Sequence, residues 1–159
     1  MRLAAAIENV SGEDDIPGPG LMRRWLRAAL SPRREAAELS VRIVDETESA
    51  ALNARYRHRS GPTNVLSFPA DLPDDIPLPL LGDLVICAPI VIREAREQQK
   101  TPEAHWAHML VHGALHLIGY DHIDDSDAEV MEALETEILV AMAFPPPYTA
   151  AGKGETTLS

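Results

Sequence analysis

Three histidines near the middle of the chain have the spacing of a metal site. His112 and His116 are four residues apart in the apolar stretch 108–118, and His122 follows after Gly119. Such a stretch is expected to be helical, and residues four apart lie on one helix face with Cβ atoms about 6 Å apart. Two imidazoles at that separation can bind one ion. Gly119 suits the left-handed backbone of a helix end, so the chain can turn there and bring His122 back as a third ligand.

Three imidazole ligands and a fourth position left for water are typical of a catalytic zinc site. The sequence therefore predicts one Zn²⁺ ion bound by His112, His116 and His122. With 6 histidines in 159 residues, the same spacing arises by accident at a rate of about one per cent. Because imidazole also binds other divalent ions, the identity of the metal stays open.

The spacing H-x-x-x-H-x-x-G-x-x-H is that of the metzincin proteases, with one difference. A zinc protease carries Glu directly after its first histidine, as general base for the attacking water. This chain has Gly113 at that position, and glycine cannot transfer a proton. The pattern indicates a zinc hydrolase and disfavours a peptidase-like one.

Length and composition favour one domain that buries its own core. We predict that the domain spans residues 1–148 and that residues 149–159, with Gly, Thr and Ser, form a disordered tail. With no run of eighteen apolar residues and no apolar leader, we expect a cytoplasmic protein without a membrane partner. The single Cys87 fits a reducing compartment and is expected to be buried and inert.

Charge is distributed unevenly along the chain. Residues 1–60 hold ten Arg against nine acids (+1) and residues 61–159 hold four bases against sixteen acids (−12), which gives the net charge of −11. This acidic balance argues against a protein that coats nucleic acid indiscriminately. Two arginine groups, at 23–34 and 55–59, could still bind phosphates locally. Ordinary surface ion pairs are the alternative, for example between Arg57 and Glu46 or Glu48.

Periodicity and turn residues predict four strands interleaved with five helices. We expect strands over 2–8, 39–44, 63–69 and 80–87, and helices over 21–30, 45–57, 89–100, 101–118 and 126–142. Thr101 and Pro102 open the fourth helix, and a capping box at 126–129 opens the fifth. The fifth helix is expected to bury Val130, Leu134, Ile138 and Met142.

The helix over 101–118 is apolar on nearly every face from Trp106 onward, so we place it at the centre of the fold. The fold class is therefore α/β (mixed α+β): a single domain with a four-stranded mixed sheet, about five helices, and a central helix that carries the metal ligands.

Several separated blocks of this sequence resemble the YbeY endoribonucleases, also called rRNA maturation factors. The similarity runs from the first predicted strand to about Tyr148. The blocks are H-G-A-L-H-L-I-G-Y-D-H at 112–122, Leu52-Asn53 with Tyr56-Arg57, P-T-N-V-L-S-F-P at 62–69, and G-D-L-V-I-C at 82–87.

The resemblance implies a bacterial, cytoplasmic, zinc-dependent endoribonuclease with a zincin-like fold and a preference for single-stranded RNA. Such a protein acts on the 3′ end of small-subunit ribosomal RNA and in ribosome quality control. Its partners would be single-stranded rRNA, the small ribosomal subunit and assembly factors, with no DNA. The family's zinc ligands correspond to His112, His116 and His122, and its functionally important arginine to Arg57.

The mechanism stays partly open at this point. Arg57 is the best candidate to hold the phosphate, because a guanidinium offers a planar fork of donors. Asp121, beside a ligand, is better suited to orient a zinc histidine than to abstract a proton. His108, one turn before His112, could lend a proton, but a packed or hydrogen-bonded histidine is the simpler interpretation. Attack by water and attack by the 2′-hydroxyl of the RNA are both open.

A non-enzymatic alternative also stays open. In that case the chain would be a ribosome-assembly factor whose zinc is structural and only shapes a docking surface.

Overall fold

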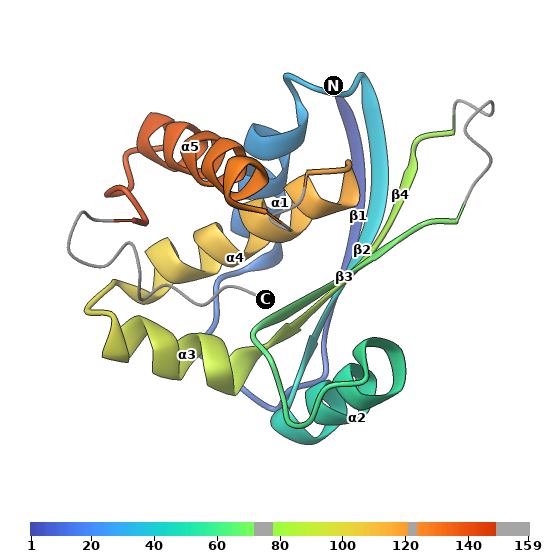
Figure 1. Ribbon diagram of the computed structural model, residues 1–159, viewed down its shortest axis with the longest axis vertical. Coiled ribbons are helices and arrows are strands. Elements are labelled where there is room, and N and C mark those ends of the chain that lie inside the picture. Colours follow the sequence, from blue (N-terminus) through green and yellow to red (C-terminus); the bar gives the residue numbers. More distant parts are fainter. Residues whose placement is uncertain (72–77, 121–123, 149–159) are drawn as a thin grey trace.

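The computed structural model (Figure 1) describes residues 1–71, 78–120 and 124–148. Within these ranges the predicted mixed α/β fold, with four strands and five helices, is confirmed. The elements are β1 (Arg2–Asn9), α1 (Pro19–Leu30), β2 (Ala36–Val44), α2 (Glu46–Arg57), β3 (Val65–Pro69), β4 (Leu80–Cys87), α3 (Ala88–Glu97), α4 (Pro102–Leu117) and α5 (Asp125–Ala141). No helix of the described ranges is both long enough and apolar enough to span a membrane.

The strands form one mixed sheet in the order β1-β2-β4-β3. β1, β2 and β4 run parallel, and β3 pairs antiparallel to β4 at the edge. β2 begins at Ala36, three residues before the predicted start. Residues 36–38 pair in register with residues 2–4 of β1, so pairing with a distant strand extends β2 beyond its alternating stretch.

Helices cover both faces of the sheet (Figure 1). α1, α4 and α5 build the larger core on one face. A smaller core on the other face includes Leu52 of α2 with Val85 of β4. α4 packs tightly on the sheet at Gly113, where an added Cβ would lie 2.8 Å from Cδ2 of Leu84 and 3.4 Å from Cγ2 of Val65. The bare backbone at Gly113 therefore lets α4 pack directly on the sheet.

The predicted central position of α4 is confirmed, because nearly all of its residues from His105 onward are buried. Thr101 caps its N-terminus, with Oγ1 accepting from the Ala104 N–H at 3.2 Å. At the other end the Gly119 N–H donates to the His116 carbonyl at 3.1 Å, and the Tyr120 N–H donates to the Leu115 carbonyl at 3.0 Å. This is a Schellman motif, and the positive φ of Gly119, 105°, is what it requires.

The predicted start and buried stripe of α5 are wrong. The carboxylate of Asp124 accepts from the Asp127 N–H at 2.8 Å and caps the helix ahead of the expected 126–129 box. The buried residues are Met131, Glu135, Ile138 and Leu139, whereas Val130 is 56% exposed and Leu134 and Met142 are only partly buried. Of the predicted stripe only Ile138 is buried. The buried face of α5 therefore differs from the predicted one, and it contains Glu135, a charged residue that the prediction left out.

Candidate functional site

The first two predicted metal ligands lie together near the C-terminus of α4. The ring centroids of His112 and His116 are 4.7 Å apart, and the ring planes meet at 74°. Two imidazoles sharing a zinc ion at about 2.0–2.1 Å each have ring centres about 5 Å apart. The arrangement of these two rings therefore fits a shared ion.

The third predicted ligand, His122, and the predicted orienting residue, Asp121, lie outside the described residues, as does the predicted tail at 149–159. Within the ranges that the structure covers, no group of three or more His, Cys, Asp or Glu side chains could hold a metal ion. The described part of the site thus contains two of the three predicted ligands.

Glu135 of α5 is the common acceptor of a buried hydrogen-bond network around these histidines. Its Oε2 accepts from Nδ1 of His112 at 2.9 Å, and its Oε1 lies 2.7 Å from Nε2 of His108. The Tyr148 hydroxyl also donates to Oε1, at 2.7 Å. Glu135 is 0% exposed. Because a carboxylate can only accept, its bond to His112 selects the tautomer with the proton on Nδ1 and orients the ring.

The electrostatics of this network favour an ionised Glu135. Burial would raise the pKa of this carboxyl, but the hydrogen bonds from His108 and His112 outweigh it and hold the pKa well below its usual range. Burial lowers the pKa of His108 to about 4, against the opposing bond to Glu135. Burial also lowers the pKa of Lys100, whose Nζ lies 3.4 Å from Nδ1 of His108. The ionised carboxylate of Glu135 is therefore buried beside Nδ1 of His112.

The interpretation of His108 as a packed, hydrogen-bonded residue is confirmed, since it is 1% exposed and bonded to Glu135. Glu135 itself was missed by the sequence analysis. A signal was present, because Glu135 follows Met131 by four residues and precedes Ile138 by three. A carboxylate at helical spacing within an apolar stripe indicates a buried polar contact.

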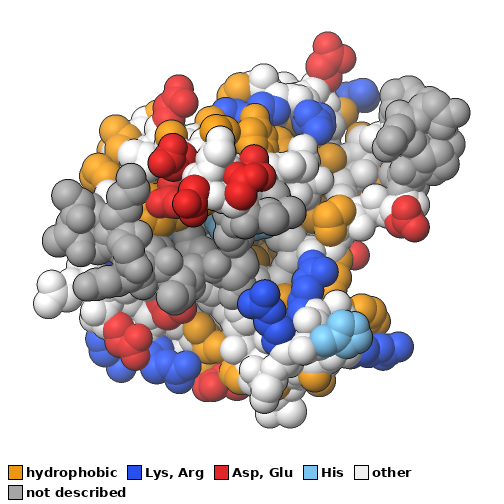
Figure 2. Space-filling view, viewed as in Figure 1, with side chains coloured by type: hydrophobic (Ala, Val, Ile, Leu, Met, Phe, Trp, Pro, Cys, Tyr) orange, Lys and Arg blue, Asp and Glu red, His pale blue; other side chains and the backbone are white. Residues whose placement is uncertain are grey.

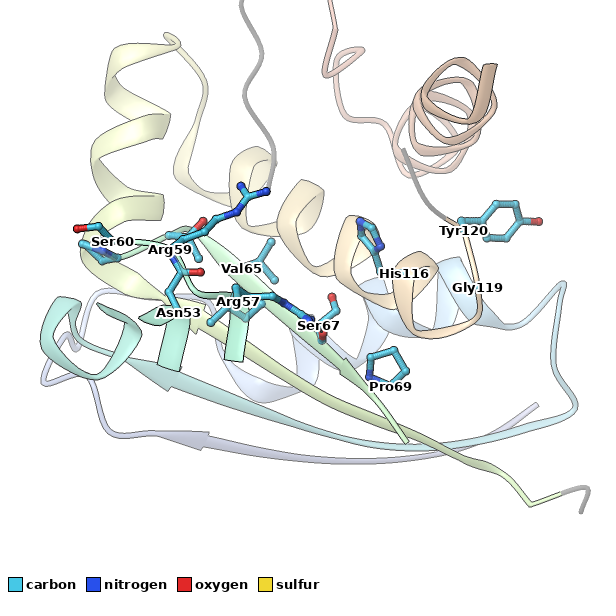
Figure 3. A pocket seen from close by; sticks show the side chains of 13 residues that line it. Asn53, Arg57, Arg59, Ser60, Val65, Ser67, Pro69, His116, Gly119 and Tyr120 are labelled. Atoms are coloured by element: carbon cyan, nitrogen blue, oxygen red, sulfur yellow. Dashed lines mark hydrogen bonds between the residues drawn. The ribbon is translucent and has the colours of Figure 1, made fainter. Parts of the chain in front are cut away.

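A cavity of about 810 Å³ opens beside His116, with β3 along its floor. Figure 3 shows Arg57 and Arg59 on one side of this cavity and His116 on the other. Arg57 donates from Nη2 to the Ser67 carbonyl, and its Cζ lies 5.2 Å from the centroid of the Phe68 ring. We call this cavity the groove.

Arg57 is not engaged by the acids that the sequence offered as alternative partners. Glu46 pairs with Arg93 at 3.9 Å and Glu48 pairs with Arg42 at 2.6 Å. Arg57 forms no ion pair within the described residues. Its charge is therefore available to an anion in the groove.

The loop after α2 is anchored to that helix, which holds Arg59 at the rim. His58 adopts a left-handed conformation with φ 56° and ends α2. Asn53 then donates from Nδ2 to the Gly61 carbonyl at 2.9 Å, and Ser49 donates from Oγ to the Thr63 carbonyl at 3.0 Å. These buried side chains tie residues 58–63 to α2.

A model of the family described as endoribonuclease YbeY matches residues 13–143. The chain belongs to the YbeY family of endoribonucleases. The matched range includes His112, His116, Glu135 and all the groove-lining residues of this YbeY protein. Because the members of this family are endoribonucleases, the protein is a hydrolase that acts on RNA. The family takes part in rRNA maturation.

The fold of this YbeY protein is also similar to a solved structure. The solution structure of TM1509 from Thermotoga maritima has a TM-score of 0.60 and 27% sequence identity. The similarity covers 94% of this chain and 99% of that chain. The two proteins therefore share their architecture over nearly their full lengths.

Proposed function

We propose that this YbeY protein is a zinc-dependent endoribonuclease that cuts single-stranded RNA in the groove between His116 and Arg57. The observation that carries the proposal is the pair of adjacent imidazoles at the end of α4, backed by Glu135 and lining the same cavity as an uncommitted arginine. We assign it to 3′-end maturation of small-subunit rRNA and to ribosome quality control in the cytoplasm, with assembly factors as partners.

The proposed ligands of one Zn²⁺ ion are His112, His116 and His122. Because Nδ1 of His112 bonds to Glu135, its Nε2 would face the ion. A zinc ion held by these three imidazoles, as in the zincins, would keep one position for water or substrate. When bound, the ion would supply Lewis acidity toward the phosphate and lower the pKa of a bound water to about 7.

Arg57 would hold the scissile phosphate. Its contacts with the Ser67 carbonyl and the Phe68 ring keep the guanidinium at the groove. A guanidinium can donate two parallel hydrogen bonds to phosphate oxygens. Charge that builds on those oxygens in the transition state is stabilised by donors already in position, so that little reorganisation is needed.

A zinc peptidase is disfavoured by packing as well as by sequence. The protease base follows the first histidine, at the position of Gly113, and a side chain there would meet Leu84 and Val65 in the sheet. A glutamate at that position would therefore point into the packed contact between α4 and the sheet.

The decisive experiment measures metal content beside cleavage of a defined single-stranded RNA. We expect the purified protein to hold one zinc ion and to cut the RNA. Cleavage should stop when a chelator removes the zinc and should resume when zinc is added back. His112→Ala and His116→Ala should each lose zinc and activity together. Zinc-loaded wild-type protein that leaves RNA uncut would instead support the assembly factor with structural zinc.

A further inference from the structure

A second cavity adjoins the groove at the end of α4. Its volume is about 390 Å³, and it is lined by Arg33, Arg34, Ile118, Gly119 and Tyr120. Gly119 and Tyr120 line the groove as well. The two cavities therefore meet at the turn that ends α4. We call the second one the arginine cavity.

The two arginines of this cavity are positioned by backbone carbonyls. Arg33 donates from Nη1 to the Ala29 carbonyl at 3.2 Å, and Arg34 donates from Nη1 to the Arg33 carbonyl at 2.8 Å. Neither arginine forms an ion pair with a carboxylate of the described residues, in contrast to Arg42 and Arg93. Since each guanidinium has five N–H donors, these contacts leave several donors for a ligand.

Among the residues that the structure describes, the linings of the groove and the arginine cavity contain arginines and no carboxylates. Arg57 and Arg59 line the first, Arg33 and Arg34 line the second, and no described Asp or Glu lines either. The whole chain has 25 acidic residues and a net charge of −11, and Figure 2 shows acidic side chains gathered over α5. Two arginine-lined cavities that share Gly119 and Tyr120, on an acidic protein, fit a flexible polyanion that passes from one cavity to the other.

We propose that Arg33 and Arg34 bind backbone phosphates of the RNA strand where it leaves the groove past Tyr120. The substrate is then held on both sides of His116, by Arg57 and Arg59 at one end and by the arginine cavity at the other. In Figure 3 the Tyr120 side chain extends from the end of α4 away from Arg57. This inference rests on the proposed function.

If Arg33 and Arg34 bind backbone phosphates, RNA affinity should depend on the length of the strand and not on its base sequence. Phosphate contacts position a strand and carry no base information. RNA long enough to pass from the groove into the arginine cavity should therefore bind more tightly than RNA that fills the groove alone, whatever its bases. An acidic protein partner would use the same charges, but it would not need a cavity continuous with the groove.

The test compares Arg33→Ala/Arg34→Ala with Arg24→Ala/Arg96→Ala in the full-length, zinc-loaded protein. The control pair removes the same charge from exposed positions that line neither cavity. The affinity for fluorescently labelled single-stranded RNA is measured by fluorescence anisotropy at several salt concentrations. Each reading is taken before cleavage is detectable. The RNA is about 4 or about 16 nucleotides long, which are the limits of the site size of one OB-fold domain that binds single strands.

With the long RNA, loss of two phosphate contacts should reduce the slope of log affinity against log salt by about 1.4 and weaken binding about tenfold at low salt. The control pair should keep the wild-type slope, and the short RNA should be cut by all variants with unchanged kcat and KM. If the double variant is less folded by circular dichroism, Arg34→Ala alone serves, since Arg34 is exposed, with an expected slope change of about 0.7.

A double variant with the wild-type slope on long RNA overturns the inference while leaving the proposed function in place. Wild-type protein that neither binds nor cuts RNA overturns both.

Discussion

Nδ1 of His112 donates a hydrogen bond of 2.9 Å to Oε2 of Glu135, and this bond joins α4 to α5 inside the protein. The same carboxylate is bonded to His108 and Tyr148. A fully buried carboxylate is stable only when hydrogen-bond donors compensate for its loss of solvation. The proposed metal centre and the packing of α5 therefore depend on one side chain.

Glu135→Gln should weaken metal binding about 10- to 100-fold, the usual effect of removing a carboxylate behind a ligating histidine. The two histidines bond to different oxygens, His108 to Oε1 and His112 to Oε2, and a glutamine replaces one of these acceptors by an NH2 donor. Competition with a chromophoric chelator measures the affinity. Glu137→Gln, an exposed change on the same helix, is the matched control. Equal metal affinity in the two variants would show that Glu135 does not support the site.

Arg57→Ala should lower the rate of RNA cleavage about 10²- to 10³-fold, the effect of losing one preorganised transition-state donor. Its zinc content should stay at the wild-type level, because Arg57 is no ligand. Arg55→Ala is the control, since Arg55 stacks on Tyr56 at 5.2 Å and is not among the groove-lining residues. Single-turnover cleavage and metal analysis are run on both. Similar rates in the two variants would contradict the phosphate-binding role.

The stability of the metal-free protein should fall as the solution is acidified through the window set by His108. Its pKa is 6.5 in the unfolded chain and about 4 in the fold, so between these values the unfolded state binds more protons. The free energy of unfolding should therefore decrease by up to about 1.4 kcal/mol for each pH unit lost in that window. The lowered pKa of Glu135 acts in the same direction below about pH 4.5.

Urea unfolding between pH 4 and pH 7 measures this dependence. His108→Gln should flatten the curve, because the group that binds the extra proton on unfolding is gone. His58→Asn, a change at an exposed histidine that ends α2, is run beside it as the matched control. A slope that is the same in His108→Gln and wild type would refute the assignment to His108.

Gly113→Glu should not create a peptidase, although it restores the residue that zinc proteases carry. The new side chain would meet Leu84 and Val65, and a carboxylate buried there without a partner costs several kcal/mol, of the order of 3 or more. Urea unfolding and a casein assay measure the two effects. Gly20→Glu is the control, because nothing lies within 4 Å of a Cβ at that helical glycine. Peptidase activity at unchanged stability would reverse this conclusion.

Much of the fold could be predicted because its signals are local. Thr101 and Pro102 start α4 and Gly119 ends it through bonds that reach no more than a few residues along the chain. The same holds for the spacing of His112 and His116, which a helix brings to one face without help from elsewhere. Alternation and apolar runs likewise located the strand ends to within two residues, except at the start of β2, where pairing with β1 extends the strand to Ala36.

The tertiary structure alone decided the surroundings of those histidines. Glu135 is 23 residues from His112, and its burial is favourable only after α4, α5 and Tyr148 have come together. Arg57 shares a cavity with His116 because α2 and α4 both border β3. Patterns along a chain report neighbours within one or two helical turns. The partner of a buried charge depends on packing between distant segments, and no local pattern contains it.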